Sequence, residues 1–513
     1  MGIGENTGQN RGENTGYRGA LATTGGGGER SWKLDAGHYE GHFDLAAVYP
    51  LPDATTNSYA RHRNAYPGVE YQIPVGVRGG EKPYRYDVIV GPTGMTIGNT
   101  LTFLIDRWVF GADYRVVKWT PVTDGPAEDV TIRVTDQAGS TINLTWTVTP
   151  TYTGFLFLDP NVSAGGTGTL TDPLSNVEEV YTNSVGNEIV YVRGGTLVMD
   201  NELLFGTAGY PMSWQNHPDE TIVMDASNQG QFAHLTATAY DIFCAGFTIL
   251  DCARYNPNAN TRVFMHFQKT YREALWQLNF VTPYRGSVGG DNQRCIVYFH
   301  VGDANTREGH NDIFISDCDY DCGGITDLPV QMVGGYGLNN FAFENIHAHN
   351  GNVGGVPIFL KGTHVDGCVS YASVLDISGT HVALIETYGA TSGTDYTNNV
   401  EVCYCKLGYD NLSDKVLYNG RSGTADYMTG IKYYRNSVYG RIANSNYSTG
   451  NEVDVYNNVI LSDQTSLAGN YLNLYSGNVL YTNTDPAPFD LATMDLIGTA
   501  RDDHLGTKGA EIA

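Results

Sequence analysis

The segment NDIFISDCDYDCGG (residues 311–324) brings acids and thiols together and is the first candidate for chemistry. Its acids are Asp317, Asp319 and Asp321, and its thiols are Cys318 and Cys322. Such a group can hold a metal ion, form an acid cluster in catalysis, or lie on one strand whose alternate side chains point in and out. We favour the strand, with the aspartates outward and Cys318 and Tyr320 inward.

A second polar segment, NIHAHNG, follows later in the chain and contains two histidines. If the two segments form neighbouring strands, Asp319 pairs with His347 and Asp321 pairs with His349. A carboxylate beside an imidazole orients that ring as an acid or a base. A glycoside hydrolase needs two carboxyl groups roughly 5 to 9.5 Å apart, which the aspartates and Glu344 would supply. This group is the candidate catalytic site.

Aromatic side chains offer a second kind of candidate, because flat amphipathic rings pack against sugars in many binding surfaces. Tyr284, Tyr388 and Tyr396 are the candidate binding residues, with surface filling as the alternative. We assign no metal ligand. His38 and His42 have a spacing that resembles a zinc motif, but Gly41 interrupts the helix that such a motif needs.

The composition predicts a mostly β protein and limits its partners. The chain of 513 residues contains 62 Gly and 35 Tyr, which favours short strands and turns over helices. Its net charge is −25, and no stretch concentrates Lys and Arg, so nucleic acid is not an expected partner. An acidic polysaccharide would be repelled unless a bound cation compensated.

The eight cysteines all lie between residues 244 and 405, and we expect thiols in a core rather than a disulfide framework. The sequence contains no apolar stretch of signal-peptide or membrane-spanning type. We therefore expect no membrane partner. Either a signal was removed, or the protein leaves its cell by another route, such as inside a virus particle.

Two segments precede the cysteine-rich part. Residues 1–66 are predicted to be an extended anchoring arm, because the first 30 residues are rich in Gly and Asn and cannot bury a core. Residues 67–150 alternate polar and apolar residues, as in VTIRV and INLTWTV, and predict a small β-sandwich. The elements GPTGM and VTDQAGST resemble immunoglobulin-like modules of bacterial surface and phage proteins.

From residue 151 to 513 a strand pattern recurs at intervals of roughly 20 to 40 residues, as in a solenoid. Equivalent positions should stack along the interior, with thiols giving way to asparagines. The predicted equivalent positions are Phe247, Asn279, Cys318, Ile346, Cys368, Cys405, Asn436, Asn458 and Asn478.

The start of this region, GFLFLDPNVSAGGTGTLTDPLSN followed by NEIVYVRGGTLVMD and LLFGTAGYPMSW, resembles right-handed parallel β-helix proteins of the pectate-lyase-like class. The resemblance implies an N-terminal cap and an all-β, single-stranded β-helix. In a lyase of this class, Lys361 would act as the base and a calcium ion would neutralise the uronate carboxylate. The sequence lacks the calcium loop of that family, so we otherwise expect no cofactor.

The order of arm, sandwich and acidic β-helix is similar to that of phage tailspikes and head spikes. That resemblance implies a homotrimeric virion spike or fibre that binds a host surface polysaccharide, with residues 1–66 contacting other virion proteins. The alternatives are a secreted, extracellular polysaccharide lyase or glycoside hydrolase, and a purely structural surface or decoration protein. Domain order carries the first hypothesis, and the acid and histidine cluster carries the second.

Overall fold

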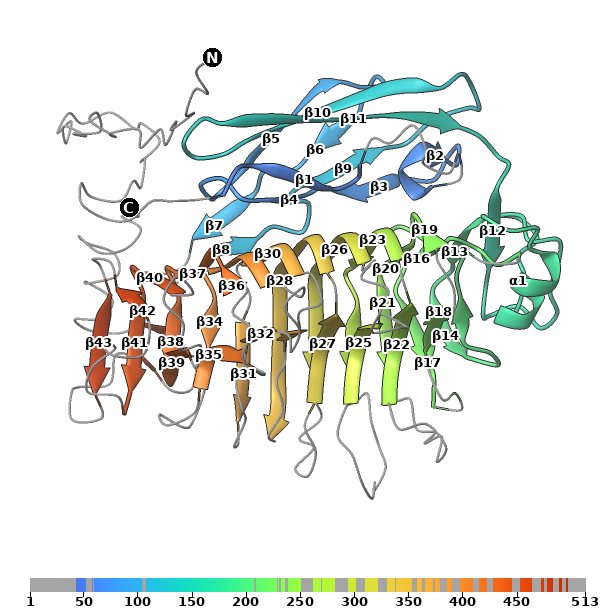
Figure 1. Ribbon diagram of the computed structural model, residues 1–513. Helices are drawn as coiled ribbons and strands as arrows, with labels where there is room; N and C mark the ends of the chain where they lie inside the picture. The colour runs from blue at the N-terminus through green and yellow to red at the C-terminus, as the bar shows by residue number, and fades with distance from the viewer. Residues whose placement is uncertain are drawn as a thin grey trace, which may run out of the picture.

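The computed structural model describes residues 43–51, 58, 60–103 and 108–206, and from there to residue 496 it describes the strands and many of their connections. The described chain has two β-rich parts, which lie one above the other in Figure 1. We call residues 43–150 the N-terminal β unit. The rest of the described chain is a stack of parallel strands.

The N-terminal β unit consists of short, mainly antiparallel sheets. They have the strand orders β1-β4, β2-β11-β10-β5, β3-β9-β6 and β7-β8. Alternation of inward and outward side chains along β10 and β11 buries Val130, Ile132, Leu144 and Trp146. The elements are β1 (Ala46–Tyr49), the 3₁₀ helix η1 (Arg61–Arg63), β2 (Asn64–Ala65), β3 (Tyr71–Pro74), β4 (Gly76–Arg78), β5 (Arg85–Val90), β6 (Thr96–Ile97), β7 (Leu101–Phe103), β8 (Trp108–Phe110), β9 (Val116–Trp119), β10 (Glu128–Thr135) and β11 (Thr141–Pro150).

The predicted arm of residues 1–66 extends too far along the chain. Strand β1 pairs with β4, and β2 pairs with β11, so both belong to the N-terminal β unit. The physical reason is the apolar sequence of β1, whose Val48 and Tyr49 are buried in a shared core. Residues 1–42 lie outside the described part of the chain.

Within the described residues, the rest of the chain forms a large parallel sheet of 23 strands and a second parallel sheet of 9 strands. From β14 to β39 the chain alternates between the two sheets, and strands pair with their counterparts in the next coil. The fold is a right-handed parallel β-helix, as the sequence predicts. Its successive coils run along the molecule from green to red in Figure 1.

The larger sheet contributes two strands, or two halves of one long strand, to most coils. Its members are β12 (Phe155–Leu158), β13 (Ile189–Val192), β14 (Gly195–Val198), β16 (Ser213–Asn216), β17 (Ile222–Asp225), β19 (Ala239–Tyr240), β20 (Phe243–Ala245), β21 (Phe247–Leu250), β23 (Thr270–Trp276), β24 (Asn279–Val281), β26 (His310–Asp321), β28 (Leu338–Asn352), β30 (Val365–Tyr371), β31 (Val374–Ser378), β33 (Thr397–Cys403), β34 (Lys406–Leu407), β36 (Met428–Thr429), β37 (Ile431–Tyr434), β38 (Ser437–Tyr439), β40 (Val453–Tyr456), β41 (Val459–Ser462), β42 (Leu472–Leu474) and β43 (Val479–Thr482).

The smaller sheet contributes one strand to each coil that it covers. Its members are β15 (Leu203–Leu204), β18 (Ala233–Leu235), β22 (Arg262–Gln268), β25 (Arg294–His300), β27 (Val330–Tyr336), β29 (Ile358–Lys361), β32 (Ile385–Gly389), β35 (Lys415–Arg421) and β39 (Arg441–Asn444). A short pair, β44 (Phe489–Asp490) and β45 (Asp495–Leu496), follows them. Helix α1 (Val177–Asn183) lies at the start of the stack, with Asn176 capping its N-terminus.

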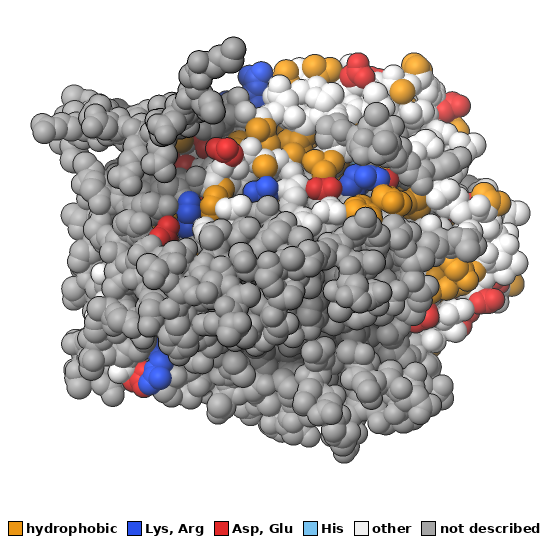
Figure 2. Space-filling view, viewed as in Figure 1, with side chains coloured by type: hydrophobic (Ala, Val, Ile, Leu, Met, Phe, Trp, Pro, Cys, Tyr) orange, Lys and Arg blue, Asp and Glu red, His pale blue; other side chains and the backbone are white. Residues whose placement is uncertain are grey.

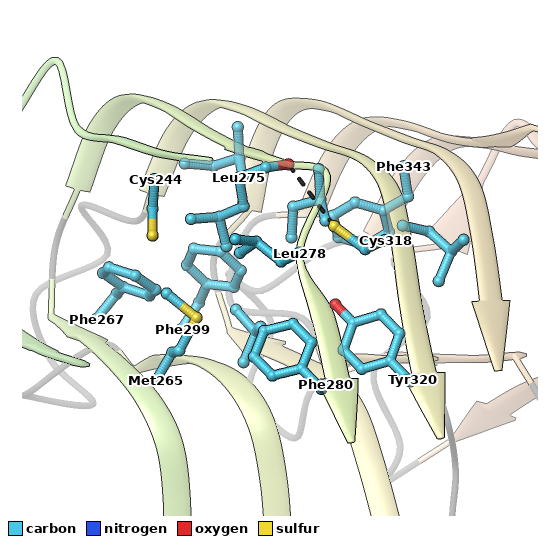
Figure 3. Close-up of a cluster of buried hydrophobic side chains, with 14 of the residues drawn as sticks. Cys244, Met265, Phe267, Leu275, Leu278, Phe280, Phe299, Cys318, Tyr320 and Phe343 are labelled. Atoms are coloured by element: carbon cyan, nitrogen blue, oxygen red, sulfur yellow. Dashed lines mark hydrogen bonds between the residues drawn. The ribbon is translucent and has the colours of Figure 1, made fainter. Parts of the chain in front are cut away.

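The interior of the coils is filled by aliphatic, aromatic and thiol side chains from both sheets (Figure 3). Cys318 and Tyr320 point inward, as predicted, and the Sγ atom of Cys318 lies 3.9 Å from the Leu275 carbonyl oxygen. Phe280 and Tyr320 stack with ring centroids 4.9 Å apart. Burial of each large apolar side chain contributes about 1.5–3 kcal/mol, so the stacked interior stabilises the coil.

The predicted interior ladder is confirmed for the pairing of Cys318 with Ile346 and for Cys405, Asn436, Asn458 and Asn478, and it is wrong at Cys368 and Asn279. The backbone N–H of Cys405 donates to Asn436, that of Asn436 to Asn458, and that of Asn458 to Asn478. Each residue therefore occupies the same position in its coil. Cys368 does not share it, because it pairs with Phe341 and Val400.

Asn279 is also displaced from the predicted ladder, because it pairs with Asp319 rather than with Cys318. The error comes from the unequal lengths of the connections between strands, which hide the register. Among the described residues, Cys244, Cys318, Cys403 and Cys405 are free thiols, as expected.

The N-terminal β unit packs along one outer side of the larger sheet (Figure 1). Six outward-facing residues of the β-helix share an apolar core with it, namely Phe243, Ala245, Ala274, Trp276, Phe314 and Ala342. Buried cations from the unit reach the β-helix at the same interface. We call this side of the sheet the covered face. None of the helices in the described chain is long and apolar enough to span a bilayer.

Candidate functional site

Strands β26 and β28 each turn sharply, and the turns divide the outer side of these strands into two surfaces. Asp317 and Asn345 stand at these turns with positive φ values of 54° and 52°. Both tolerate this left-handed conformation better than β-branched residues do. Before the turn, the strands lie under the N-terminal β unit. After the turn, their outer side is a second surface, which we call the open face and define by Asp319, Asp321, His347 and His349.

Asp319, His347 and His349 form a compact cluster on the open face. Asp319 pairs in register with His347, as the sequence predicts. One oxygen of Asp319 lies 2.7 Å from Nδ1 of His347, and the other lies 3.1 Å from Nε2 of His349. The two imidazole rings stack, with centroids 4.4 Å apart and planes 13° from parallel. A single carboxylate therefore holds both histidines.

The cluster is reachable from solvent and electrostatically coupled. The side chains of His347, Asp319 and His349 are 43%, 39% and 25% exposed. Burial alone would raise the pKa of Asp319, but the hydrogen bonds with His347 and His349 outweigh it and lower that pKa. Asp319 is therefore a carboxylate at neutral pH, able to orient either ring or to ligate a cation.

Two further acids lie beside the histidines by strand register. Asp321 pairs with His349 on one side, as predicted. Asp376, in β31, pairs with His349 on the other side. The sequence analysis missed Asp376, although a correct register for β31 would have found it. The open face thus concentrates acidic positions around two imidazoles.

The structure places Asp317 and Glu344 away from this cluster, although the sequence grouped them with it. Both contact Arg115 of the N-terminal β unit, at 2.8 Å from Asp317 and 3.3 Å from Glu344. Asp317 also accepts hydrogen bonds from Trp276 and Asn345. Glu344 is buried on the covered face. Their positions fit a role in joining the two parts of the chain.

Glu344 has an unusual ionisation equilibrium because of this position. Burial raises its pKa to about 7, against the attraction of Arg115. The neighbouring acids Asp317 and Glu344 in turn raise the pKa of Arg115 above its ordinary value, although burial opposes them. Arg115 is therefore a permanent cation on the covered face. Its role could not be predicted from the sequence, because no local pattern links Arg115 to Asp317, which lies 202 positions later.

The proposed lyase base and the tyrosines fall elsewhere. Lys361 ends β29 in the smaller sheet, whereas the cluster belongs to the larger sheet. Tyr388, in β32, pairs in register with Lys361. Tyr284 and Tyr396 lie outside the described residues. The structure therefore brings Lys361 together with one candidate binding tyrosine, and not with Asp319 in one sheet.

Comparisons with known proteins give similarity in fold only. No protein-family model matches the sequence, and no curated protein matches it. Pectate lyase Pel9A is 13% identical, with a TM-score of 0.40 over 70% of this chain and 89% of that one. PfbA, a surface adhesin of Streptococcus pneumoniae, is 12% identical, with a TM-score of 0.36 over 56% of this chain and 79% of that one.

A third similar structure is the GH136 lacto-N-biosidase from Eubacterium ramulus. It is 11% identical, with a TM-score of 0.32 over 64% of this chain and 68% of that one. At such identities no residue of the cluster can be assigned a role by correspondence. Its chemistry follows from its own donors, namely two imidazoles and a carboxylate in mutual contact on an accessible surface.

Proposed function

We propose that this protein binds a polysaccharide through the open face of its β-helix. The observation that carries the proposal is the exposed cluster of Asp319, His347 and His349. Imidazoles and carboxylates donate and accept hydrogen bonds, and Asp319 and His347 occupy paired positions on neighbouring coils, about 4.8 Å apart. A polymer with many hydroxyl groups can contact several coils at once on such a face.

The charge of the protein narrows the glycan class. The chain carries a net charge of −25, and Asp321 and Asp376 flank His349 in register. On the side of the molecule shown in Figure 2, the Lys and Arg side chains of the described residues are scattered rather than gathered in a band. A neutral glycan therefore fits the open face without electrostatic repulsion, and an acidic one needs a cation.

The biological setting that we propose is a virion spike or fibre. In this proposal, the Gly- and Asn-rich N-terminal segment contacts other virion proteins, three chains assemble into a homotrimer, and the polysaccharide belongs to the host surface. What supports it is the order of the segments in the sequence, with a Gly- and Asn-rich start, a β-rich unit and a long acidic β-helix. A secreted, extracellular protein is the alternative setting.

A second candidate function is cleavage of the bound glycan, and the contact between Asp319 and His347 favours it. A carboxylate 2.7 Å from Nδ1 fixes the ring of a half-exposed histidine. A ring held in this way can take or give a proton at its other nitrogen. His347 would then act on a sugar hydroxyl or on the proton beside a uronate carboxylate, with Asp319 as the positioning residue.

Binding to a panel of neutral and acidic bacterial polysaccharides tests the proposal. We expect one or more neutral glycans to bind the full chain, and the double variant Asp319→Asn/His347→Ala to weaken that binding at least tenfold. Asp87→Asn, an exposed carboxylate on β5, is the matched control and should leave the affinity unchanged. Equal binding by the wild type and the double variant would refute a role for the open face.

The same incubations separate binding from cleavage. Unsaturated products that absorb in the ultraviolet identify a lyase, and new reducing ends without unsaturation identify a hydrolase. Binding without products identifies an adhesin. If cleavage occurs and persists in His347→Ala, the catalytic role given to this histidine is wrong.

A further inference from the structure

We propose that Asp319, His347 and His349 bind a divalent transition-metal ion, for which Zn²⁺ is the natural candidate. One ligand atom from each of the three residues lies within 4.8 Å of the other two. The sequence predicts the pairing of Asp319 with His347, but it places His349 opposite Asp321 and assigns no metal ligand to these residues. In the structure, His349 also contacts Asp319, so the stacked coils bring all three side chains together.

The local structure explains why the three donors converge. His347 and His349 alternate on β28, so both project from the same side of the strand. Asp319 occupies the paired position on β26, one strand spacing away. The nearly parallel rings aim Nδ1 of His347 and Nε2 of His349 at opposite oxygens of one carboxylate. One donor atom of each residue thus lies within 4.8 Å of the other two.

The donor set selects the class of ion. Two imidazole nitrogens and one carboxylate oxygen suit zinc and its neighbours among the divalent transition metals. Calcium instead takes six to eight oxygen ligands. Three protein ligands leave at least one coordination position for water or another oxygen donor. This arrangement is typical of an accessible zinc site rather than a closed structural one.

The distances are compatible with an ion after a small adjustment. Ligands about 2.0–2.1 Å from a tetrahedral zinc ion are about 3.3 Å from each other. The observed separations of 2.7 Å and 3.1 Å are those of hydrogen bonds. An ion would replace the shared protons, and the pair now 2.7 Å apart would separate by about 0.6 Å. The partly exposed side chains of His347 and Asp319 have room for that movement.

The surroundings favour a cation as well. Asp321 and Asp376 are the register neighbours of His349 on its two sides. Added to the net charge of −25, these acids make the local potential negative and raise the local concentration of cations.

A bound ion would also affect glycan binding. This effect, unlike the metal site itself, rests on the proposed function. The free coordination position of the ion would accept a hydroxyl or carboxylate oxygen of the glycan. The positive charge would also offset the acidic positions of the open face. The ion would therefore extend recognition to an acidic polysaccharide, which the bare face repels.

Titration of the full-length chain, without an affinity tag and after removal of metal ions, with ZnCl₂ alone tests the proposal. We expect calorimetry to show one ion per chain with a dissociation constant of 10 µM or tighter. His347→Ala, His349→Gln and Asp319→Asn should each weaken the binding at least tenfold. His217→Ala removes a histidine that contacts Glu220 outside the cluster, and it should leave the affinity unchanged.

Two measurements make the outcome decisive. Co²⁺ should give a visible absorption band of low-coordinate cobalt with nitrogen and oxygen ligands, and the Asp319→Asn variant should lose that band. A hundredfold excess of Ca²⁺ should not displace Zn²⁺. The proposed site is wrong if the wild type does not bind zinc, or if the wild type and the three variants bind it equally well. Because no glycan is present, failure here leaves the glycan-binding proposal to be judged on its own data.

Discussion

Two stretches of the same strands meet opposite environments in this molecule. Asp317 and Glu344 stand before or at the turns of β26 and β28 and are held by Arg115 on the covered face. Asp319 and His347 stand just after those turns and contact one another on the open face. Residue type and spacing are nearly the same on both sides. The docking of the N-terminal β unit therefore decides which acids are available for function.

The covered face shows how buried acids are tolerated. Lys82 of the N-terminal β unit lies 3.1 Å from Glu401, and both side chains are fully buried. Tyr434 donates a hydrogen bond to Glu401 as well. A buried charge without a partner is strongly unfavourable, whereas a paired one is tolerated. Acids on the covered face are matched by cations from the other part of the chain, and Asp319 on the open face is matched by histidines from the next coil.

The largest expected effect comes from removing a cation of the covered face. Arg115→Ala removes the cation that contacts both Asp317 and Glu344. Loss of one partner from a buried ion pair costs about 3–5 kcal/mol. We expect the free energy of unfolding to fall by that amount, measured from the midpoint of urea unfolding by circular dichroism.

Arg85→Ala is the matched control, because Arg85 pairs with Asp87 on an exposed strand and its side chain is 67% exposed. Its effect should stay below about 0.5 kcal/mol, as for other surface pairs. The triple variant Arg115→Ala/Asp317→Asn/Glu344→Gln should recover part of the stability that Arg115→Ala loses. An Arg115→Ala effect no larger than that of Arg85→Ala would contradict the role given to the covered face.

This contrast also marks where prediction from the sequence succeeds. The inward placement of Cys318 and Tyr320 follows from alternation along a strand, and the pairing of Asp319 with His347 follows from the stacking of equivalent positions in neighbouring coils. Both are local or nearest-neighbour properties, so a single sequence reveals them. The β-helix class is visible for the same reason, because its repeating strands depend mainly on their neighbours.

Prediction from the sequence fails where contacts are long-range. Glu344 is a plausible catalytic acid by its spacing, and only the docking of Arg115 buries it. The register of Cys368 is lost because connections of unequal length separate the strands. The boundary of the arm at residue 66 is misplaced because the pairing partner of β1 comes later in the chain, in β4. None of these contacts leaves a periodic signal in the sequence.

The pH dependence of stability gives a second, smaller test of the covered face. Glu344 has a pKa of about 7 in the folded protein against an ordinary value of 4.5. Between these values the folded state binds more protons than the unfolded state. The stability that protonated Glu344 contributes is therefore fully present below about pH 4.5 and is lost as the pH rises to about 7. The loss is on the order of 3 kcal/mol.

Urea unfolding midpoints from pH 4.5 to pH 8 measure this effect. The wild type should lose stability across the window more steeply than Glu344→Gln, which cannot ionise there. Glu128→Gln, a substitution at the first residue of β10, serves as the control and should follow the wild-type curve. Parallel curves for the wild type and Glu344→Gln would mean that Glu344 is ionised throughout and that its burial has little influence on its pKa.

The smallest effect on stability is expected at the open face. Asp319→Asn removes a charge whose side chain is 39% exposed and whose contacts are two partly exposed histidines. Exposed ion pairs contribute less than about 1 kcal/mol, so the urea midpoint should barely move. Zinc and glycan binding should nevertheless fall at least tenfold. Such a separation of binding from stability is what distinguishes a functional cluster from an interface. If Asp319→Asn destabilised the chain as much as Arg115→Ala, the cluster would be a structural contact between coils, and the distinction between the two faces would be lost.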